Sequence, residues 1–561
     1  DDEDNLPRLA VEYGPPNPAL DPLLNQIKGR YIVDGQHFLK SIRSLEIHRE
    51  RCVKSTQGWF KLVKSRSLAL FWYLDFECPF CKECRTVTNE PLHTDTEKKL
   101  NNQECHKKLT IAESTVWGVI SAGSGFRQLE EIFSHLGIKC MSNSTFMKLE
   151  QNIGENWKTV FTDEMIQAGR EEKMLALRNG DVTEQGIPYI TVIVDGGWSH
   201  RSFGHRYTAS SGVACVIGWR TKKLLYVGVR NKYCYTCEYR KRNNISTEHE
   251  VCYKNWNGTS AAMESDMIVE AFCSSMDIHG LQYRVMIGDG DSSTFKKIKE
   301  NVPYGRHVIK RECANHVVKN YTKALFNLQK QLGNNGKKIL PNTKIMKLKV
   351  LARMAITYSY NSKHKLGVES LRADLKNGPK HVFNIHTHCK SYYCKTSTEN
   401  SVNISSLLFE KIIEKINDVL KMLVQKAPQL TTNDTSNLAE NYMSLIAKFS
   451  GGKQINRGNK GSYTHRSFGA ALDFQLGPEW SYKTWKKVAT SPYSPLKKFG
   501  MKKKLQIEYK RRSLTNSFNK KKLINETKKK KLFENRGEED YGEYCQKLDM
   551  DEETFEIEKK T

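Results

Sequence analysis

Two short stretches place aspartates directly after apolar runs, where the carboxylates are able to bind a metal ion. One is PYITVIVDGG, residues 188–197, which carries Asp195, and the other is MIGDGDSS, residues 286–293, which carries Asp289 and Asp291. Apolar runs rich in β-branched residues predict buried strands. Carboxylate oxygens are the ligands that Mg²⁺ or Mn²⁺ prefers. Asp289 is nearer to the strand end, so we predict that it is the ligand and that Asp291 shapes the turn.

The elements around these acids follow the order of an α/β fold. Strands and one helix are predicted, in chain order, at 188–195, 211–231, 260–276, 283–291 and 306–313. The range 211–231 reads as two strands around a turn. Three consecutive strands followed by crossovers match a ribonuclease H-like core with a mixed five-stranded sheet. In such a sheet the first and fourth strands are neighbours, so Asp195 and Asp289 are expected to face each other.

Glu440, in the stretch TSNLAENYM, is the candidate for a third acid. Three acids can hold two metal ions, which activate an attacking oxygen and stabilise a leaving oxygen. The alternative is structural: Asn437 precedes Glu440 by three residues, a capping-box spacing in which the glutamate bonds the helix N-terminus. Spacing alone leaves both interpretations open.

Several motifs in this order resemble a known family. They are YITVIVDGGWSHRSFGHRYTASSGVACVIGWRTKKLLYVGVRNKYCYTC, CYKNWNGTSAAMESDMIVEAF, VMIGDGDSSTFKKI and ECANHVVKNY. Together they resemble the Mutator-like transposase domain of many animal genomes, over roughly residues 29–470. The resemblance implies a DDE-type DNA transposase whose acids fall on Asp195, Asp289 and Glu440. It also implies Mg²⁺-dependent strand cleavage and strand transfer, transposon-end and target DNA as partners, a homo-oligomer and a nuclear location.

Cysteines and histidines occur in spacings that favour structural zinc. Fifteen cysteines in 561 residues are too sparse for a disulfide scaffold, which favours a reducing compartment. Chelating pairs that flank a loop are typical of tetrahedral zinc. The predicted zinc sets are His48, Cys52, Cys78 and Cys81 near the N-terminus, where Cys84 can replace one member, and Cys234, Cys237, His249 and Cys252 in a loop insertion.

A further Cys/His pair lies in CANH, directly after the fifth predicted strand. Cys313 and His316 match the Cys-x-x-His motif of Mutator-type transposases, but tetrahedral zinc needs two more ligands. The predicted helical insertion offers three, which are His386, Cys389 and Cys394. We expect two of them to complete the site and tie the insertion to the core. The alternative is a buried cysteine beside a hydrogen-bonded histidine.

The chain is strongly basic, with a formal net charge of +27, so a polyanion such as DNA is the expected partner. The loop 448–467 offers phosphate ligands at Lys453, Arg457, Lys460 and Arg466, and Trp198 offers a face on which a base can stack. The loop is equally consistent with a solvated basic segment, and Trp198 with a core residue.

The C-terminal tail concentrates charge. Residues 497–531 carry 15 Lys/Arg against two acids, and residues 532–561 carry 11 acids against four Lys/Arg. Blocks of like charge predict disorder, with a nuclear-address or DNA-binding role, or a merely solubilising one. The longest apolar run near the N-terminus, residues 68–74, is far too short to span a bilayer.

The sequence divides into seven expected segments. They are an irregular lead-in (1–40), a zinc-binding region (41–110), a helical region (111–187), the first part of the core (188–316, with an insertion at 232–257), a helical insertion (317–430), the last part of the core (431–487) and a disordered tail (488–561).

The leading function is a DDE-type transposase. The alternatives are a domesticated, inactive DNA-binding zinc protein, a ribonuclease H-like nuclease, and a non-enzymatic zinc protein that binds acidic partners.

Overall fold

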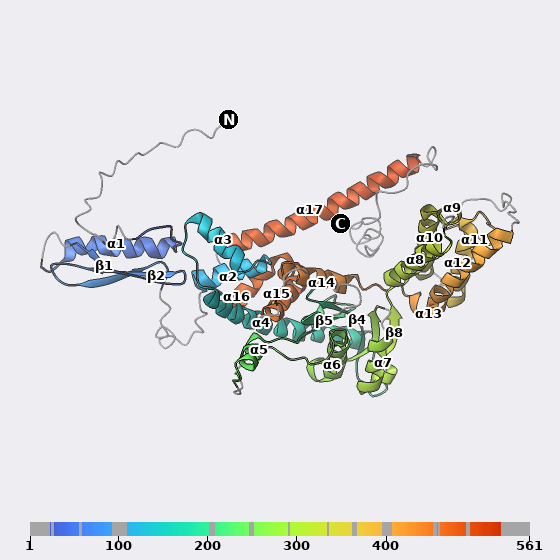
Figure 1. Ribbon diagram of the computed structural model, residues 1–561, viewed down its shortest axis with the longest axis horizontal. Helices are drawn as coiled ribbons and strands as arrows, with labels where there is room; N and C mark the ends of the chain where they lie inside the picture. Colours follow the sequence, from blue (N-terminus) through green and yellow to red (C-terminus); the bar gives the residue numbers. More distant parts are fainter. Residues whose placement is uncertain are drawn as a thin grey trace.

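The computed structural model describes residues 23, 27–54, 59–91, 109–200, 208–245, 249, 252–289, 292–333, 336–361, 367–394, 407–452, 457, 461–489 and 494–528. The molecule is elongated, as Figure 1 shows. A small α/β unit lies at one end, a helical lobe lies at the other, and a mixed sheet with its covering helices lies between them.

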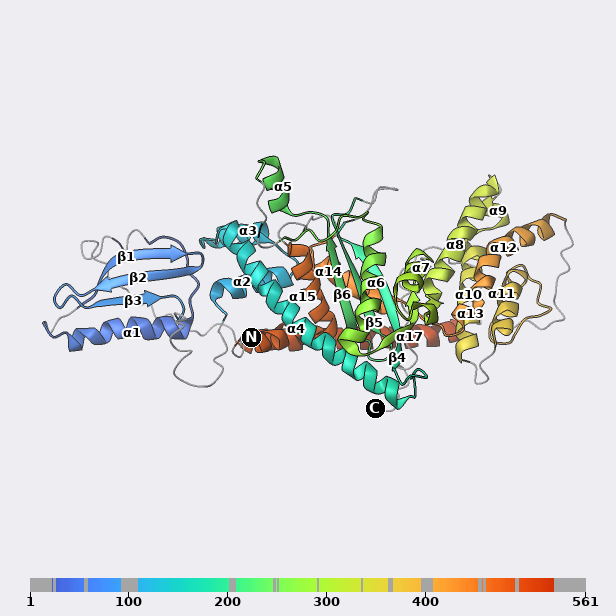
Figure 2. The same ribbon diagram turned by 90° about the horizontal axis from the view of Figure 1, so that it is seen from below.

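The N-terminal unit is a helix packed on a three-stranded sheet. The helix is α1 (Gly35–Arg51), and the strands are β1 (Lys61–Leu68), β2 (Phe71–Glu77) and β3 (Cys84–Thr88), which pair antiparallel in that order. Figure 2 shows α1 running along the sheet. The helix begins earlier than the expected lead-in to residue 40 allows, because the Asp34 carboxylate accepts a hydrogen bond from His37 N and caps it.

The central sheet has five strands, which are β4 (Tyr189–Trp198), β5 (Ser211–Gly218), β6 (Leu224–Asn231), β7 (Gln282–Gly288) and β8 (Ile309–Glu312). Their order across the sheet is β6-β5-β4-β7-β8. Strands β4, β5 and β6 pair antiparallel in chain order, whereas β7 is parallel to β4 and β8 is parallel to β7. The parallel pairs need crossovers, which contain α6 (Ala262–His279), α7 (Ser292–Asn301) and the short 3-10 helix η3 (Gly305–His307). The predicted mixed five-stranded sheet is therefore present.

The side chains of β4 alternate between two cores, one on each face of the sheet. Ile193 packs in the core that includes α14 (Asn437–Phe449), whereas Val192 and Val194 pack in the core that includes α6 and α7. Because strand side chains alternate, Asp195 lies on the α14 face.

The helices of the α14 face form the largest core. They are α2 (Ile111–Ser121), α3 (Phe126–Leu136), α4 (Asn143–Arg178), α14, α15 (Ser462–Leu476) and α16 (Trp480–Val488), with the 3-10 helix η7 (Gly477–Glu479). Trp117 and Trp157 meet edge to face at its centre, 5.2 Å between ring centroids. Arg466 is also buried there, because its Nε donates to Glu150 at 2.9 Å and its Nη atoms donate to backbone carbonyls.

The helical lobe lies in the chain between β8 and α14. Its helices are α8 (Ala314–Gln331), α9 (Gly336–Ile339), α10 (Asn342–Asn361), α11 (Val368–Val382), α12 (Leu407–Gln425) and α13 (Ala427–Leu430). The lobe has a core of its own, in which Leu325, Ile356 and Leu371 are fully buried. Among all the helices in the described ranges, none is long and apolar enough to cross a membrane.

The tail contains a long helix, α17 (Ser494–Lys528), so the expected disorder is wrong for these residues. Residues just before and within the basic run 497–531 find partners on the rest of the molecule. Leu496 packs against the large core, and Lys503 Nζ lies 3.3 Å from Asp473 Oδ1. Lysine, arginine and leucine also favour helix intrinsically. Residues 529–561 lie outside the described residues.

Arg466→Ala is expected to destabilise the protein by about 3–5 kcal/mol, because it leaves the Glu150 carboxylate buried without its partner. Urea unfolding followed by tryptophan fluorescence measures this loss, since Trp117 and Trp157 lie in the same core. The matched control is Lys487→Ala, which removes an exposed pair with Glu164 and is expected to cost less than about 1 kcal/mol. Equal stability of the two variants would contradict a structural role for Arg466.

Candidate active site and metal-binding clusters

Asp195 lies within β4 rather than at its end. The strand continues to Trp198, and Asp195 pairs with Cys215 of β5. The two glycines that follow leave room for helices on both faces. A Cβ on Gly197 would lie 3.0 Å from Met443 Sδ of α14, and one on Gly196 would lie 2.4 Å from Glu264 Cγ of α6. These glycines therefore allow α14 to pack closely beside Asp195.

Asp289 follows β7 directly, at the level of Asp195. The parallel register pairs Ile193 with Ile287, so two residues further along each strand are Asp195 and Asp289. The Asp289 side chain is 49 % exposed and forms an ion pair with His316 Nδ1. Asp291 lies outside the described residues, so its predicted turn role stays a prediction.

Glu440 lies in the first turn of α14, and its carboxylate does not form the capping box that was the structural alternative. The N-cap is Ser436, which makes no side-chain capping bond, and Glu440 Oε1 lies 3.2 Å from His316 Nε2. Its side chain is 51 % exposed. The imidazole of His316 therefore bridges Asp289 and Glu440 with its two nitrogens.

The first turn of α8 is fixed to the residues that precede α14. Backbone N–H of Ala314 donates to Asp434 O at 2.9 Å, and both the backbone N–H and the hydroxyl of Ser436 donate to Cys313 Sγ at 3.3 Å. Asn315 Nδ2 donates to Asn437 Oδ1 at 3.1 Å. These contacts hold His316 next to Glu440, although Cys313 and Ser436 are 123 positions apart in the chain.

Charges at this site are strongly coupled. Burial raises the pKa of Asp195 to about 7, and the charges of Asp289 and Glu440 act in the same direction. The hydrogen bond to Asp289 raises the pKa of His316 to about 10, with Cys313 acting in the same direction and burial opposing it. A cluster of acids whose negative charges are not fully balanced by neighbouring positive charges is suited to bind a divalent cation.

The types of side chain present suit a magnesium-type site, and the group whose ligand atoms all lie within 4.8 Å of one another contains Asp289, Cys313 and His316 but not the other two acids. Mg²⁺ takes one or two carboxylates and keeps water and substrate oxygens as its remaining ligands. Asp289 and Glu440 are half exposed, and the third carboxylate, Asp195, is close enough for its pKa to respond to both. Asp195, Asp289 and Glu440 are the residues that would hold such an ion.

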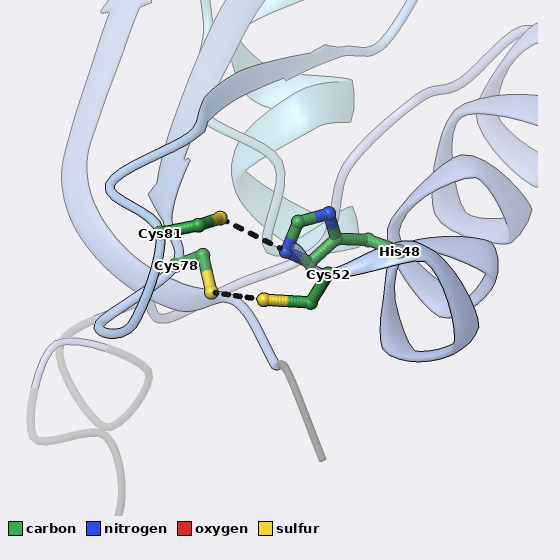
Figure 3. A group of neighbouring side chains, drawn as sticks. All are labelled: His48, Cys52, Cys78 and Cys81. Atoms are coloured by element: carbon green, nitrogen blue, oxygen red, sulfur yellow. Dashed lines mark hydrogen bonds between the residues drawn. The ribbon is translucent and has the colours of Figure 1, made fainter. Parts of the chain in front are cut away.

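The N-terminal Cys/His set comes together between α1 and the β2–β3 connection, as Figure 3 shows. Cys52 Sγ lies 3.9 Å from Cys78 Sγ, and Cys81 Sγ lies 3.5 Å from His48 Nε2. Bond lengths to tetrahedral zinc imply S–S and S–N edges of about 3.8 and 3.6 Å, so this set has the size of a zinc site. Its four ligand atoms all lie within 4.8 Å of one another, and Cys84 is exposed outside the group.

His48 is also oriented by a second contact, since its Nδ1 lies 3.0 Å from Glu83 Oε2. A carboxylate on the far nitrogen of a ligand histidine fixes its tautomer and raises its basicity. Burial opposes ionisation of Cys78, but hydrogen bonds from the Cys81 backbone and from His48 lower the pKa of that thiol to about 6. The thiolate form that zinc requires is therefore favoured.

The loop set Cys234, Cys237, His249 and Cys252 also comes together, around the start of α5 (Tyr235–Arg242). His249 Nε2 lies 3.0 Å from Cys237 Sγ and 3.7 Å from Cys234 Sγ, and Cys237 Sγ lies 3.5 Å from Cys252 Sγ. This composition, three thiols and one imidazole, is common in structural zinc sites.

The expected zinc site shared by CANH and the insertion is not formed, and this prediction is corrected. Cys313 and His316 group with Asp289, whereas the fourth partner of His386, Cys389 and Cys394 is His381. The reason is that α8 carries the chain away from the sheet, while α11 ends beside its own C-terminal loop. The spacing H-x4-H-x2-C-x4-C was a usable signal for His381, since all four residues fall within 14 positions.

The predicted DNA-binding residues have structural partners where the structure describes them. Arg466 is fully buried, which excludes the predicted phosphate contact. Arg457 Nε donates to Ser450 O at 3.2 Å, and burial lowers the pKa of its guanidinium to about 10. Trp198 Nε1 donates to Ser260 O at 2.8 Å, and its ring packs against the α6 core. Lys453 and Lys460 lie outside the described residues.

Comparison with known proteins agrees with the predicted resemblance. The family model of the Mutator-like transposase matches residues 29–394, which is more than half of the chain, and the chain belongs to this family. The match includes Asp195 and Asp289 and ends before Glu440. A search of curated proteins finds no match.

Asp195→Asn is expected to stabilise the protein in buffer without Mg²⁺ or Mn²⁺, increasingly as pH rises. A carboxylate whose pKa in the folded protein is raised from 3.8 to about 7 destabilises the protein increasingly as pH rises from about 4 to about 7. Above about pH 7 the destabilisation changes little. At 1.36 kcal/mol per pKa unit, the Asn variant gains about 2–4 kcal/mol at pH 8. Urea unfolding from pH 5 to 8 measures this difference.

The matched control for that experiment is Asp418→Asn, because Asp418 is 58 % exposed and pairs only at the surface with Lys421. Its stability difference from wild type is expected to stay within about 0.5 kcal/mol over the same range. A pH-independent effect of Asp195→Asn would contradict the charge coupling described above.

Proposed function

We propose that this protein is a DDE-type DNA transposase with a ribonuclease H-like core, and that Asp195, Asp289 and Glu440 are its catalytic acids. The observation that supports this most directly is that His316 contacts both Asp289 and Glu440, while the charges of these two acids raise the pKa of Asp195 on the neighbouring strand. The sheet order β6-β5-β4-β7-β8 and the family membership support the same proposal.

The reaction is phosphodiester cleavage followed by strand transfer. Bound Mg²⁺ or Mn²⁺ would polarise the scissile phosphate and favour the ionised form of the attacking hydroxyl, first of water and then of a DNA 3′-end. The chain's own part is to hold Asp195 and Asp289 level on neighbouring strands and to bring Glu440 to them on α14. The half-exposed carboxylates of Asp289 and Glu440 leave this edge open to a substrate as large as DNA.

His316 acts in this proposal as a positioning residue. Its two nitrogens contact Asp289 and Glu440, and the Ser436 hydroxyl and Cys313 lie beside it. The imidazole therefore fixes the direction of both carboxylates before a cation binds. Its positive charge also partly offsets the repulsion between the acids, since the charge of His316 lowers the pKa of Asp195.

The remaining parts of the proposal concern zinc and DNA. Zinc at the N-terminal set would join the end of α1 to the β2–β3 connection, and zinc at the loop set would fix the start of α5 to the residues around His249 and Cys252. Double-stranded DNA is the partner, and the net charge of +27 and the basic helix α17 provide attraction for its phosphates. Assembly as a homo-oligomer and a nuclear location follow from the same proposal.

Asp289→Asn and Glu440→Gln are each expected to lower strand cleavage and strand transfer by at least about 10²–10³-fold. Loss of a metal ligand removes several kcal/mol of transition-state stabilisation, and each 1.36 kcal/mol is tenfold in rate. The assay uses Mn²⁺ or Mg²⁺ and labelled DNA that flanks the coding sequence in its genome. DNA affinity is measured in parallel and is expected to change little.

The matched control is Glu300→Gln, an exposed helix carboxylate on α7 that pairs with Lys296 and is expected to keep wild-type activity. Wild-type protein that binds DNA but neither cleaves nor joins it would support the domesticated alternative. Cleavage of RNA–DNA hybrids but not of DNA would support the nuclease alternative. Full activity in both Asp289→Asn and Glu440→Gln would refute the proposed acids.

A further inference from the structure

The end of α11 and the loop after it bring together four side chains that can bind a metal ion. Along the chain, these residues are distant from the three acids of the candidate active site. They are His381 in the last turn of α11 and His386, Cys389 and Cys394 in the loop, and all four ligand atoms lie within 4.8 Å of one another. His386 and Cys394 are buried, and the other two are half-buried.

The contacts between these atoms match the edges of a tetrahedron around one zinc ion. His381 Nδ1 lies 3.2 Å from His386 Nδ1 and 3.3 Å from Cys389 Sγ, and His386 Nδ1 lies 3.4 Å from Cys394 Sγ and 3.7 Å from Cys389 Sγ. Zinc bond lengths of about 2.0 Å to nitrogen and 2.3 Å to sulfur imply N–N edges of about 3.4 Å and N–S edges of about 3.6 Å.

The neighbours of the four residues orient them as ligands. Asn377 Nδ2 lies 3.6 Å from Cys389 Sγ and donates to Tyr393 OH at 2.8 Å. Polar groups that bond to ligand atoms from outside are typical of metal sites. A set of two thiols and two imidazoles selects zinc among the common divalent ions.

The loop contributes little to the apolar core of the lobe and is held mainly by polar and ring contacts, so a metal crosslink would add to its stability. Residues 383–394 form turns rather than a helix or strand, and Phe383 is the only large apolar side chain of this loop that is buried. The loop is held to the lobe by Lys390, which pairs with Asp374 at 2.8 Å, and by Tyr392, which stacks on Tyr358 of α10 at 3.8 Å between centroids. A metal that binds only the folded loop adds its binding energy to folding.

We infer that His381, His386, Cys389 and Cys394 form a closed structural zinc site that fixes the loop 383–394 onto α11. This site belongs to the helical lobe alone and is independent of Cys313 and His316. It goes beyond the proposed transposase activity, since it assigns a third zinc site with two sulfur and two nitrogen ligands, where the other two sites have three sulfurs and one nitrogen.

The test is the zinc content of the full-length protein, reconstituted with Zn²⁺, separated from excess metal by gel filtration and measured by mass spectrometry. His381→Ala and Cys394→Ser are each expected to lose one zinc ion per chain relative to wild type. The matched control is His388→Ala, because His388 lies in the same loop but is exposed outside the cluster. It is expected to keep all the zinc, and so is Cys313→Ser.

A second variant guards against loss of zinc through misfolding. His381→Cys supplies a different ligand at the same position and is expected to retain the zinc and the wild-type pattern of limited proteolysis, whereas His381→Ala is expected to become sensitive within residues 383–394. Retention of all zinc by His381→Ala, or equal loss from His388→Ala or Cys313→Ser, would overturn the assignment. None of these measurements depends on DNA cleavage, so they test the zinc site separately from the proposed function.

Discussion

The arrangement of the candidate active site depends on one contact, between the first turn of α8 and the residues that lead into α14. The helical lobe separates these two segments in the chain, and Cys313, Ala314 and Asn315 join them to residues 434–437 in space. Because the contact is made by backbone groups and a buried thiol, it fixes the direction in which α14 starts. The position of Glu440, one turn into that helix, follows from it.

The same contact explains how an insertion of more than 100 residues is accommodated without disturbing the sheet. The lobe has its own apolar core and joins the rest of the molecule at the ends of α8 and α13. The ion pair of Lys426 with the buried Glu312, at 3.0 Å, supports this junction from the other side. Loops of any length cost little extra entropy once their ends are fixed, so the core tolerates the lobe.

Charge is the second organising feature of the site. Two carboxylates, those of Asp289 and Glu440, contact one imidazole, and burial together with the charges of these two acids raises the pKa of Asp195. Such an arrangement costs stability in the absence of a cation and is therefore most simply explained by function. His316 reduces that cost, because its raised pKa keeps a positive charge between Asp289 and Glu440.

Much of this could be predicted from sequence because the signals were local. Apolar strands, the turn between β5 and β6, and the chelating pairs near Cys52 and Cys234 depend on residues close together in the chain. The continuation of β4 past Asp195 could not be predicted, because it depends on pairing with β5 across the sheet. The burial of Arg466 needed Glu150, more than 300 residues away, and the partners of Cys313 needed the path of α8.

The tail shows the limit of composition as a guide. Its charge predicted disorder, whereas Leu496 and Lys503 find partners on the large core and α17 forms from there. Similarly, the glycines after Asp195 make room for α6 and α14, which the local sequence does not indicate. In both cases the deciding contact is tertiary.

The most direct test of the account is to locate bound Mn²⁺ by anomalous diffraction from crystals of the full-length protein grown without chelator. We expect a peak bounded by the carboxylates of Asp195, Asp289 and Glu440, with the His316 imidazole turned away from at least one of them. The peak is expected to disappear in Asp289→Asn. Mn²⁺ bound elsewhere on the chain, with this site free of anomalous density at saturating concentration, would contradict a metal site built from these three acids.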